Sequence, residues 1–441
     1  MKPSAGAFFL LMTTTPLLPQ EIPFVRYELP NGLLVILHED HRIPLVTVNL
    51  WYYVGSKDEP QGRSGFAHLF EHLMFMGTEK VPYPEFDVVM EKSGGFNNAT
   101  TSEDRTNYFE TGPGNLLETF LFLEADRMAF LGDSMTQEKL DTQREVVRNE
   151  RRQSYENRPY GKVELEIPNR IYPEKHPYHE PVIGSHEDLE RASVADVKEF
   201  FHRFYFPRNA SLVIAGDFDL SRARELVSKY FAPLPSRPGV EHRKSAPDAR
   251  IEGTVRATIA DSVELPLSVF VWHSPALFKD GDADLDVLAS ILGGGKSSRL
   301  YRSLVYEKKL AQEVSVTEDS SYLTSKFEIM AYARPGSSQD QIEAEVDREL
   351  EELRRDGPTQ REVDRARNRI DASFWDRAQS LGERADLLNR YQFFFGDPGA
   401  ITRDRARYEK VTVESVKKWA NELLKPEARL ILRVVPEKSN K

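Results

Sequence analysis

Cysteine is absent from the 441-residue chain. Disulfides, thiolate metal sites and cysteine nucleophiles are therefore excluded, and any bound metal must be held by histidine and carboxylate side chains. No segment approaches the roughly 20 apolar residues that a transmembrane helix needs. Acidic residues outnumber basic ones, and the formal net charge is −11. This charge argues against a general nucleic-acid binder, which carries a basic patch or has a high pI.

The residues that are present give the composition of an ordinary globular protein, 40% apolar and 29% charged. The chain is too long for one typical core, so two or more domains are expected. Lys2 and the apolar residues 5–12 resemble the core of a short signal peptide, although no clear A-x-A cleavage site follows. We interpret residues 1–24 as an N-terminal tail or signal segment, which leaves bacterial periplasm and cytoplasm both open.

Local patterns predict an α+β fold. Asn31-Gly32 is a strong two-residue turn signal and centres a predicted hairpin over residues 26–37. Residues 44–53 are rich in β-branched and aromatic side chains, which predicts a central strand. The other predicted strands are residues 96–102, 106–109 and 210–215, and predicted helices occupy residues 86–92, 116–130, 136–155 and 194–203.

The second half of the chain repeats features of the first. Residues 193–198 and 412–417 share a pattern at an offset of 219 without a gap, each ahead of a proline and an apolar strand. Ile43-Pro44 before a strand likewise recurs as Leu265-Pro266. Two copies of one α+β unit are the simplest interpretation, joined by a proline-rich, charged linker. The predicted division is residues 25–232, a linker at residues 233–249, and residues 250–436.

One motif points to metal chemistry. His68, Glu71 and His72 are set in the apolar run of residues 65–77 with the spacing H-x-x-E-H. On a helix, residues i and i+4 lie one turn apart on one face, so both imidazoles can reach one metal ion and Glu71 can touch a water on it. A lone buried histidine is usually a core residue, but two histidines and a carboxylate in an apolar helix are costly to bury without a ligand.

The motif supplies two metal ligands, whereas a catalytic zinc typically has three protein ligands and an open position for water. The third ligand is expected on the predicted helix that contains residues 143–152. Glu145 and Glu150 both lie there, and spacing alone does not choose between them.

Taken together, these residues resemble the M16 peptidase family of insulinase, pitrilysin and mitochondrial processing peptidase, over essentially the whole chain from Val25 onwards. The family motif is H-x-x-E-H followed, a little under eighty residues later, by a glutamate ligand. Glu150 lies 78 positions after His72 in the matching Asn149-Glu150 context, so the resemblance selects it. The family often has a supporting glutamate seven residues before the ligand, and this chain has Gln143 there.

The resemblance implies a zinc metalloendopeptidase of the M16B type, with one zinc per chain held by His68, His72 and Glu150. The zinc would polarise the scissile carbonyl and lower the pKa of its water, with Glu71 as general base. In fold, the resemblance implies two homologous α/β-sandwich domains, the second inactive, that form one half of a clam-shell chamber.

The resemblance also gives the strand at residues 96–102 a function. In the family the matching strand is an exposed edge that pairs with extended peptide, and here Asn98, Ala99 and Thr100 occupy it. Main-chain hydrogen bonds hold any sequence in this mode, so specificity is expected to be loose. The alternative is an ordinary edge strand, which would need protection by charge or bulges, and this stretch has little.

One departure from the family concerns partners. Its second domain grips substrate with an arginine and, seven residues later, a tyrosine, whereas this chain has Val305 and Gln312 at those positions. We therefore expect a heterodimer with a homologous subunit that keeps the pair and lacks the zinc motif. A self-sufficient homodimeric peptidase and, with less weight, a non-catalytic scaffold subunit are the alternatives.

Overall fold

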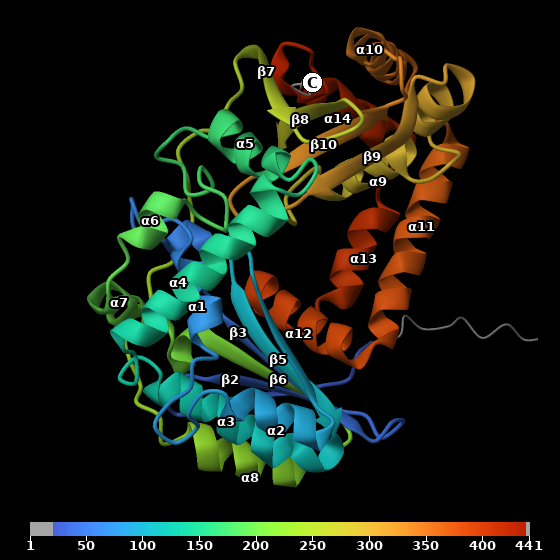
Figure 1. The fold of residues 1–441 in the computed structure, drawn as a ribbon. Helices are drawn as coiled ribbons and strands as arrows, with labels where there is room; N and C mark the ends of the chain where they lie inside the picture. The colour runs from blue at the N-terminus through green and yellow to red at the C-terminus, as the bar shows by residue number, and fades with distance from the viewer. Residues whose placement is uncertain (1–20, 438–441) are drawn as a thin grey trace, which may run out of the picture.

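A computed structural model describes residues 21–437 of the protein (Figure 1). The first twenty residues of the predicted tail or signal segment lie outside this range. Among the described residues, no helix is both long enough and apolar enough to cross a membrane.

The first sheet has six strands in the order β1-β2-β6-β3-β5-β4. The predicted hairpin is confirmed as β1 and β2 in antiparallel pairing, with Gly32 at a φ of +91° in the turn. The predicted central strand is β3, which lies between β6 and β5. The bounds are β1 Val25–Glu28, β2 Leu34–Glu39, β3 Leu45–Tyr52, β4 Phe96–Thr101, β5 Thr106–Pro113 and β6 Ala210–Gly216.

The helices of the first half include every one predicted there. They are α1 Phe66–Leu73, α2 Glu85–Ser93, α3 Leu117–Phe130, α4 Gln137–Arg151, α5 Lys162–Ile171, α6 His186–Glu190, α7 Val194–Phe204 and α8 Leu220–Phe231. The sequence did not predict α5, α6 or α8. The helix predicted over residues 136–155 is divided, because α4 ends at Arg151 and a π-helical turn, Arg152–Glu156, follows it.

The second sheet has five strands in the order β7-β11-β8-β10-β9. Its elements are β7 Gly253–Asp261, β8 Leu267–Ser274, α9 Asp282–Gly293, a π-helical turn Tyr301–Glu307, β9 Ala311–Asp319, β10 Ser325–Ala333, α10 Gln339–Asp356, α11 Gln360–Gln379, α12 Leu381–Phe395, α13 Ile401–Glu409, α14 Val413–Leu423 and β11 Ala428–Pro436. In the second sheet β7 and β11 are parallel, and the other pairs are antiparallel. The first sheet likewise has one parallel pair, β2 with β6, among antiparallel ones. Apart from β1, the two sheets therefore have one topology, and the α+β duplication predicted from the sequence is confirmed.

Each half of the chain contributes a helix to the other half's sheet. Helix α5 buries Val163, Ile167 and Ile171 among β8 and β11 residues of the second sheet. Helix α12 buries Leu381, Ala385 and Leu388 among β2 and β6 residues of the first sheet, and Figure 1 shows it against that sheet. Residues 235–252 between the halves form neither helix nor strand. These two clusters, one on each sheet, are therefore built jointly by the two halves of the chain.

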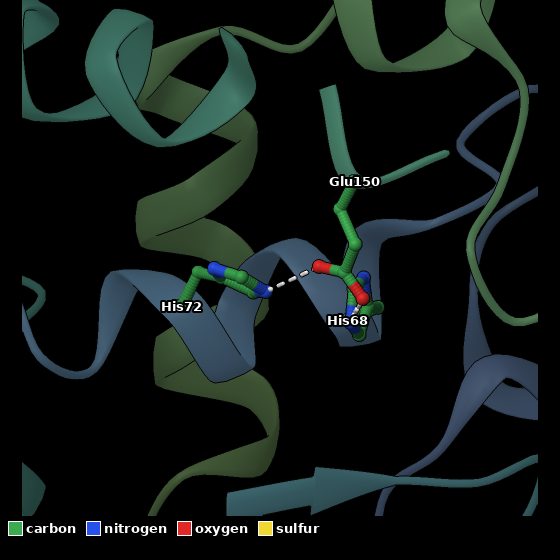
Figure 2. Close-up of side chains that lie close together, drawn as sticks. All are labelled: His68, His72 and Glu150. Carbon is green, nitrogen blue, oxygen red and sulfur yellow. Dashed lines mark ion pairs between the residues drawn. The ribbon is translucent and has the colours of Figure 1, made fainter. Parts of the chain in front are cut away.

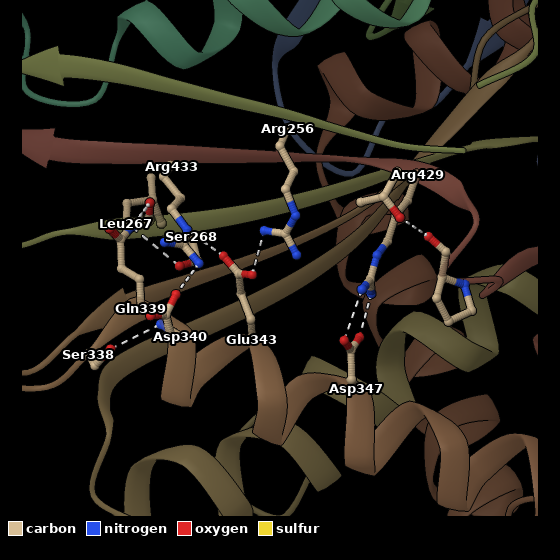
Figure 3. Close-up of polar contacts among 12 residues, drawn as sticks. Arg256, Leu267, Ser268, Ser338, Gln339, Asp340, Glu343, Asp347, Arg429 and Arg433 are labelled. Atoms are coloured by element: carbon tan, nitrogen blue, oxygen red, sulfur yellow. Dashed lines mark hydrogen bonds and ion pairs between the residues drawn. The ribbon is translucent and has the colours of Figure 1, made fainter. Parts of the chain in front are cut away.

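Ion pairs fasten α10 to the second sheet (Figure 3). Arg256 of β7 donates to Glu343 over 2.8 Å, and Arg429 of β11 donates to Asp347 over 2.9 Å. Arg433, further along β11, contacts both Asp340 and Glu343. Because these acids follow one another along a single face of α10, the helix is fixed in both position and rotation.

Candidate metal centre

The start of α1 is fixed by two neighbouring loops. Gly65 has a φ of +84°, and a Cβ there would lie 2.8 Å from the Ile183 carbonyl oxygen, so this position requires glycine. The Glu59 carboxylate accepts the backbone N–H groups of Gly65 at 3.2 Å and Ala67 at 2.7 Å. These bonds satisfy donors that a helix N-terminus leaves free.

Three potential metal ligands converge between α1 and α4 (Figure 2). Glu150 Oε2 lies 3.2 Å from His72 Nε2, and Glu150 Oε1 lies 3.7 Å from His68 Nε2. One ligand atom from each residue lies within 4.8 Å of the others. Glu145, the other candidate, pairs with Arg148 at 2.8 Å and has a side chain that is 55% exposed. The packing of α4 on α1 thus brings Glu150, and not Glu145, to the histidines.

The protonation states of this group suit metal binding. Burial lowers the pKa of His68 to about 4, with a further lowering from His72 and an opposing effect from Glu150. The hydrogen bond with His72 holds the pKa of Glu150 below its ordinary value. At neutral pH His68 is therefore neutral and Glu150 ionised, as coordination requires. Two imidazoles and one carboxylate are a known donor set for catalytic zinc, and these residues fit it.

Glu71 lies beside the donor set on α1. Its Oε2 atom accepts a hydrogen bond from Thr101 Oγ1 of β4 at 2.5 Å. Burial raises the pKa of Glu71, and the Thr101 hydrogen bond acts in the opposite direction. Thr101 is not among the predicted site residues, because a contact between a helix and a strand thirty residues later leaves no periodic signal in the sequence.

Gln143 is placed differently from the other residues of the predicted site. It lies two turns before Glu150 on α4, and its Nε2 donates to Met76 Sδ at 2.8 Å. Within residues 21–437 it forms no hydrogen bond with His68, His72 or Glu150. The hydrogen bond found for the Gln143 side chain in the described chain is thus with Met76, and its supporting role stays a prediction.

The predicted docking strand lies at a sheet edge. In the described part of the chain β4 pairs only with β5, and its other side has no strand neighbour. Asn98 and Thr100 are exposed, whereas Ala99 faces the core at 6% exposure. The backbone N–H of Ala99 donates to Asn98 Oδ1 at 2.9 Å, so a side-chain oxygen accepts from this donor.

The two positions that depart from the family lie at the edge of the second sheet. Val305 is buried at 7% exposure in the π-helical turn, and Gln312 is exposed near the start of β9. Arg334, at the end of β10, donates to the carbonyl oxygens of Val305 at 3.2 Å and Ala311 at 3.0 Å. The Arg334 guanidinium, which contacts the backbone at Val305 and beside Gln312, is therefore already engaged.

Comparisons with known proteins identify relatives named as zinc proteases, in agreement with the metal-binding arrangement of His68, His72 and Glu150. Residues 34–183 match the family described as insulinase (peptidase family M16), and residues 191–370 match the peptidase M16 inactive domain. Zinc protease PqqE of Helicobacter pylori is 30% identical over 90% of this chain and 89% of its own length. The uncharacterized zinc protease YmxG of Bacillus subtilis is 24% identical over 92% of this chain and 97% of its own.

Solved structures show the same architecture. The crystal structure of a protease from Helicobacter pylori has a TM-score of 0.87 and 28% identity, covering 95% of this chain and 100% of that one. A structure from Pseudomonas fluorescens described as a peptidase M16 inactive domain has a TM-score of 0.83 at 19% identity, covering 95% and 99% of the two chains. The second likeness concerns the fold alone.

Proposed function

The chain belongs to peptidase family M16, and from that premise we propose that it is a zinc-dependent metalloendopeptidase that cleaves extended peptides or small unfolded proteins. The observation that carries the proposal is the convergence of His68, His72 and Glu150, with Glu71 beside the two histidines on α1. We assign the catalytic domain to residues 25–232 and the inactive homologous domain to residues 250–436.

The residues of the site divide the chemistry between them. His68, His72 and Glu150 hold the metal, and zinc bound there supplies a Lewis acid that polarises the scissile carbonyl and makes water more acidic. Glu71 takes a proton from the attacking water and then gives it to the leaving amine. Gln143 supports α4 through Met76 without adding charge near the ligands.

The substrate binds along the free edge of β4, at Asn98, Ala99 and Thr100. A peptide carbonyl takes the place of Asn98 Oδ1 as acceptor for the Ala99 N–H. Because the contacts are to main chain, the position of the cleaved bond depends more on extended conformation than on side-chain identity.

The active enzyme is a heterodimer with a homologous subunit that lacks the zinc motif. Catalysis needs the peptide held in register while charge develops on the carbonyl. Val305 has no side-chain donor, Gln312 lacks a charged fork, and the Arg334 guanidinium is engaged with backbone carbonyls. The partner therefore supplies the arginine and tyrosine that grip the substrate.

The test measures metal content and turnover together. The purified chain should hold about one zinc and hydrolyse unstructured peptides only when an equal amount of the partner is added. Full turnover by the chain alone would favour the homodimeric peptidase. A zinc-free chain that stays inactive with every homologous partner would favour the scaffold subunit and overturn the proposed function.

A further inference from the structure

The Glu71 side chain has a single hydrogen bond in the described chain. A glutamate on a helix surface has several rotamers, and holding it in one costs conformational entropy. The only hydrogen bond found to its carboxylate within residues 21–437 is the 2.5 Å bond from Thr101 Oγ1 to Oε2. The other oxygen, Oε1, accepts no protein hydrogen bond there and is available to accept a proton.

Thr101 is well suited to hold this carboxylate. It is β-branched, so its χ1 is restricted and its hydroxyl points in one direction. Along β4 side chains alternate between the two faces, and Thr101 shares the face of the buried Ala99, which is turned toward α1. The neighbouring Thr100 faces the other way and donates to Asn107 of β5.

The hairpin tip beside Thr101 is anchored at several points. The backbone N–H of Ser102 donates to the Arg105 carbonyl at 2.9 Å. Asp104 accepts hydrogen bonds from the Tyr178 hydroxyl at 2.7 Å and from the backbone N–H of Tyr322 at 2.8 Å. Lys57 Nζ donates to the Asp104 carbonyl oxygen at 2.8 Å. Thr101 is therefore held against a rigid turn that the second half of the chain also supports.

We propose that Thr101 is a positioning residue that fixes the general base Glu71 relative to the strand on which the peptide docks. The inference rests on the proposed function and deepens it. Thr101 follows Asn98, Ala99 and Thr100 on β4. The strand that holds the substrate therefore also positions the Glu71 carboxylate, so the distance between the peptide and the base is fixed by one element.

The variants are Thr101→Val, which keeps the shape but removes the donor, and Thr101→Ser, which keeps the donor. Thr111→Val is the matched control, because it removes a 2.8 Å hydroxyl–hydroxyl contact with Thr47 in the same sheet away from α1. With the holoenzyme and its partner, Thr101→Val should lower kcat by about 10- to 100-fold with KM unchanged, since small misplacements of a catalytic group have effects of this order. Thr101→Ser should restore kcat to within about 3-fold, and zinc content and Tm should stay at wild-type values.

A second measurement does not depend on activity. In crystal structures of the metal-free proteins, Glu71 should leave its position or occupy several rotamers in Thr101→Val and keep its position in Thr101→Ser. Wild-type kcat together with an unmoved Glu71 in Thr101→Val would overturn the inference while leaving the proposed function intact. An inactive wild-type enzyme would overturn the proposed function, and the crystal structures would still decide whether Thr101 holds Glu71.

Discussion

The two halves of the molecule share a sheet topology, and each has a helix with two polar residues spaced i and i+4, but the partners of these residues differ. In the first half, α1 presents His68 and His72, spaced i and i+4, to Glu150 of α4. In the second half, α9 presents Asp282 and Asp286 at the same spacing to α13. Arg407 pairs with Asp282 at 2.7 Å, and the Tyr408 hydroxyl donates to Asp286 at 2.6 Å.

The difference lies in what satisfies each cluster. On α9 the carboxylates meet donors from the chain itself, so the cluster is complete. Between α1 and α4 two imidazole nitrogens and a carboxylate face one another, and no lysine or arginine of the described chain forms an ion pair with Glu150. A carboxylate set between two imidazoles, with no lysine or arginine beside it, is stabilised by an added cation. The two sheets position both clusters, and the side chains decide whether a cluster is satisfied by the chain itself or could hold a metal.

The largest expected effect comes from the base. Glu71→Gln should lower kcat by about 10²- to 10⁴-fold, the range typical of general acid–base catalysis, while zinc stays bound. The matched control is Glu318→Gln on β9, a buried carboxylate of the second half that accepts from Ser274, and it should leave kcat near wild type. Peptide hydrolysis and metal analysis measure both. Loss of zinc from Glu71→Gln, with zinc retained by Glu150→Gln, would reverse the assigned roles.

Helices α5 and α12, which each pack on the sheet of the other half, test whether the two halves unfold independently. Ile167 of α5 and Leu388 of α12 are 3% and 1% exposed, so changing either to alanine should lower the free energy of unfolding by about 2–5 kcal/mol. Because each packs on the opposite half's sheet, each variant should shift one shared thermal transition. Glu166→Ala on the surface of α5 should change stability by no more than about 0.5 kcal/mol. Two separate transitions, each moved only by the variant in its own half, would contradict this.

Metal affinity distinguishes the two glutamates of α4. Glu150→Gln should weaken zinc binding by more than about 100-fold, because even loss of an outer partner weakens it about 10- to 100-fold. Glu145 lies on a different face of α4 and pairs with Arg148. The Glu145→Gln variant should therefore bind zinc as the wild type does. Competition with a chromogenic chelator measures both affinities. Equal affinities in the two variants would remove Glu150 from the ligand set.

The smallest effect concerns the free edge of β4. Ala99→Pro removes the N–H that now donates to Asn98, and loss of one hydrogen bond should weaken peptide binding by about 1 kcal/mol, or roughly 5-fold. Ala99→Ser keeps the N–H and serves as the control. Affinity for an uncleaved peptide is best measured in a Glu71→Gln background. Unchanged affinity in a correctly folded Ala99→Pro protein would count against β4 as the docking edge.

Local sequence signals predicted much of this architecture and failed where the chain breaks local rules. Asn31-Gly32 predicted the first hairpin, and the β-branched run predicted β3. Helix α5 was missed although Val163, Ile167 and Ile171 recur every four residues, because Pro168 inside it normally breaks a helix. Helix α6 has only five residues, too few for a periodic signal.

The sequence by itself determined the spacing of His68, Glu71 and His72, since a helix carries residues four apart to one face whatever surrounds it. It also indicated the duplication of one α+β unit, through segments that recur at a fixed offset. Spacing alone left Glu145 and Glu150 open, the family resemblance selected Glu150, and the packing of α4 on α1 places it beside the histidines. Only the tertiary structure joined Thr101 to Glu71 and packed α5 and α12 on the sheet of the other half. These choices depend on how one element rotates and packs against another distant in sequence, and local propensity carries no information about that contact.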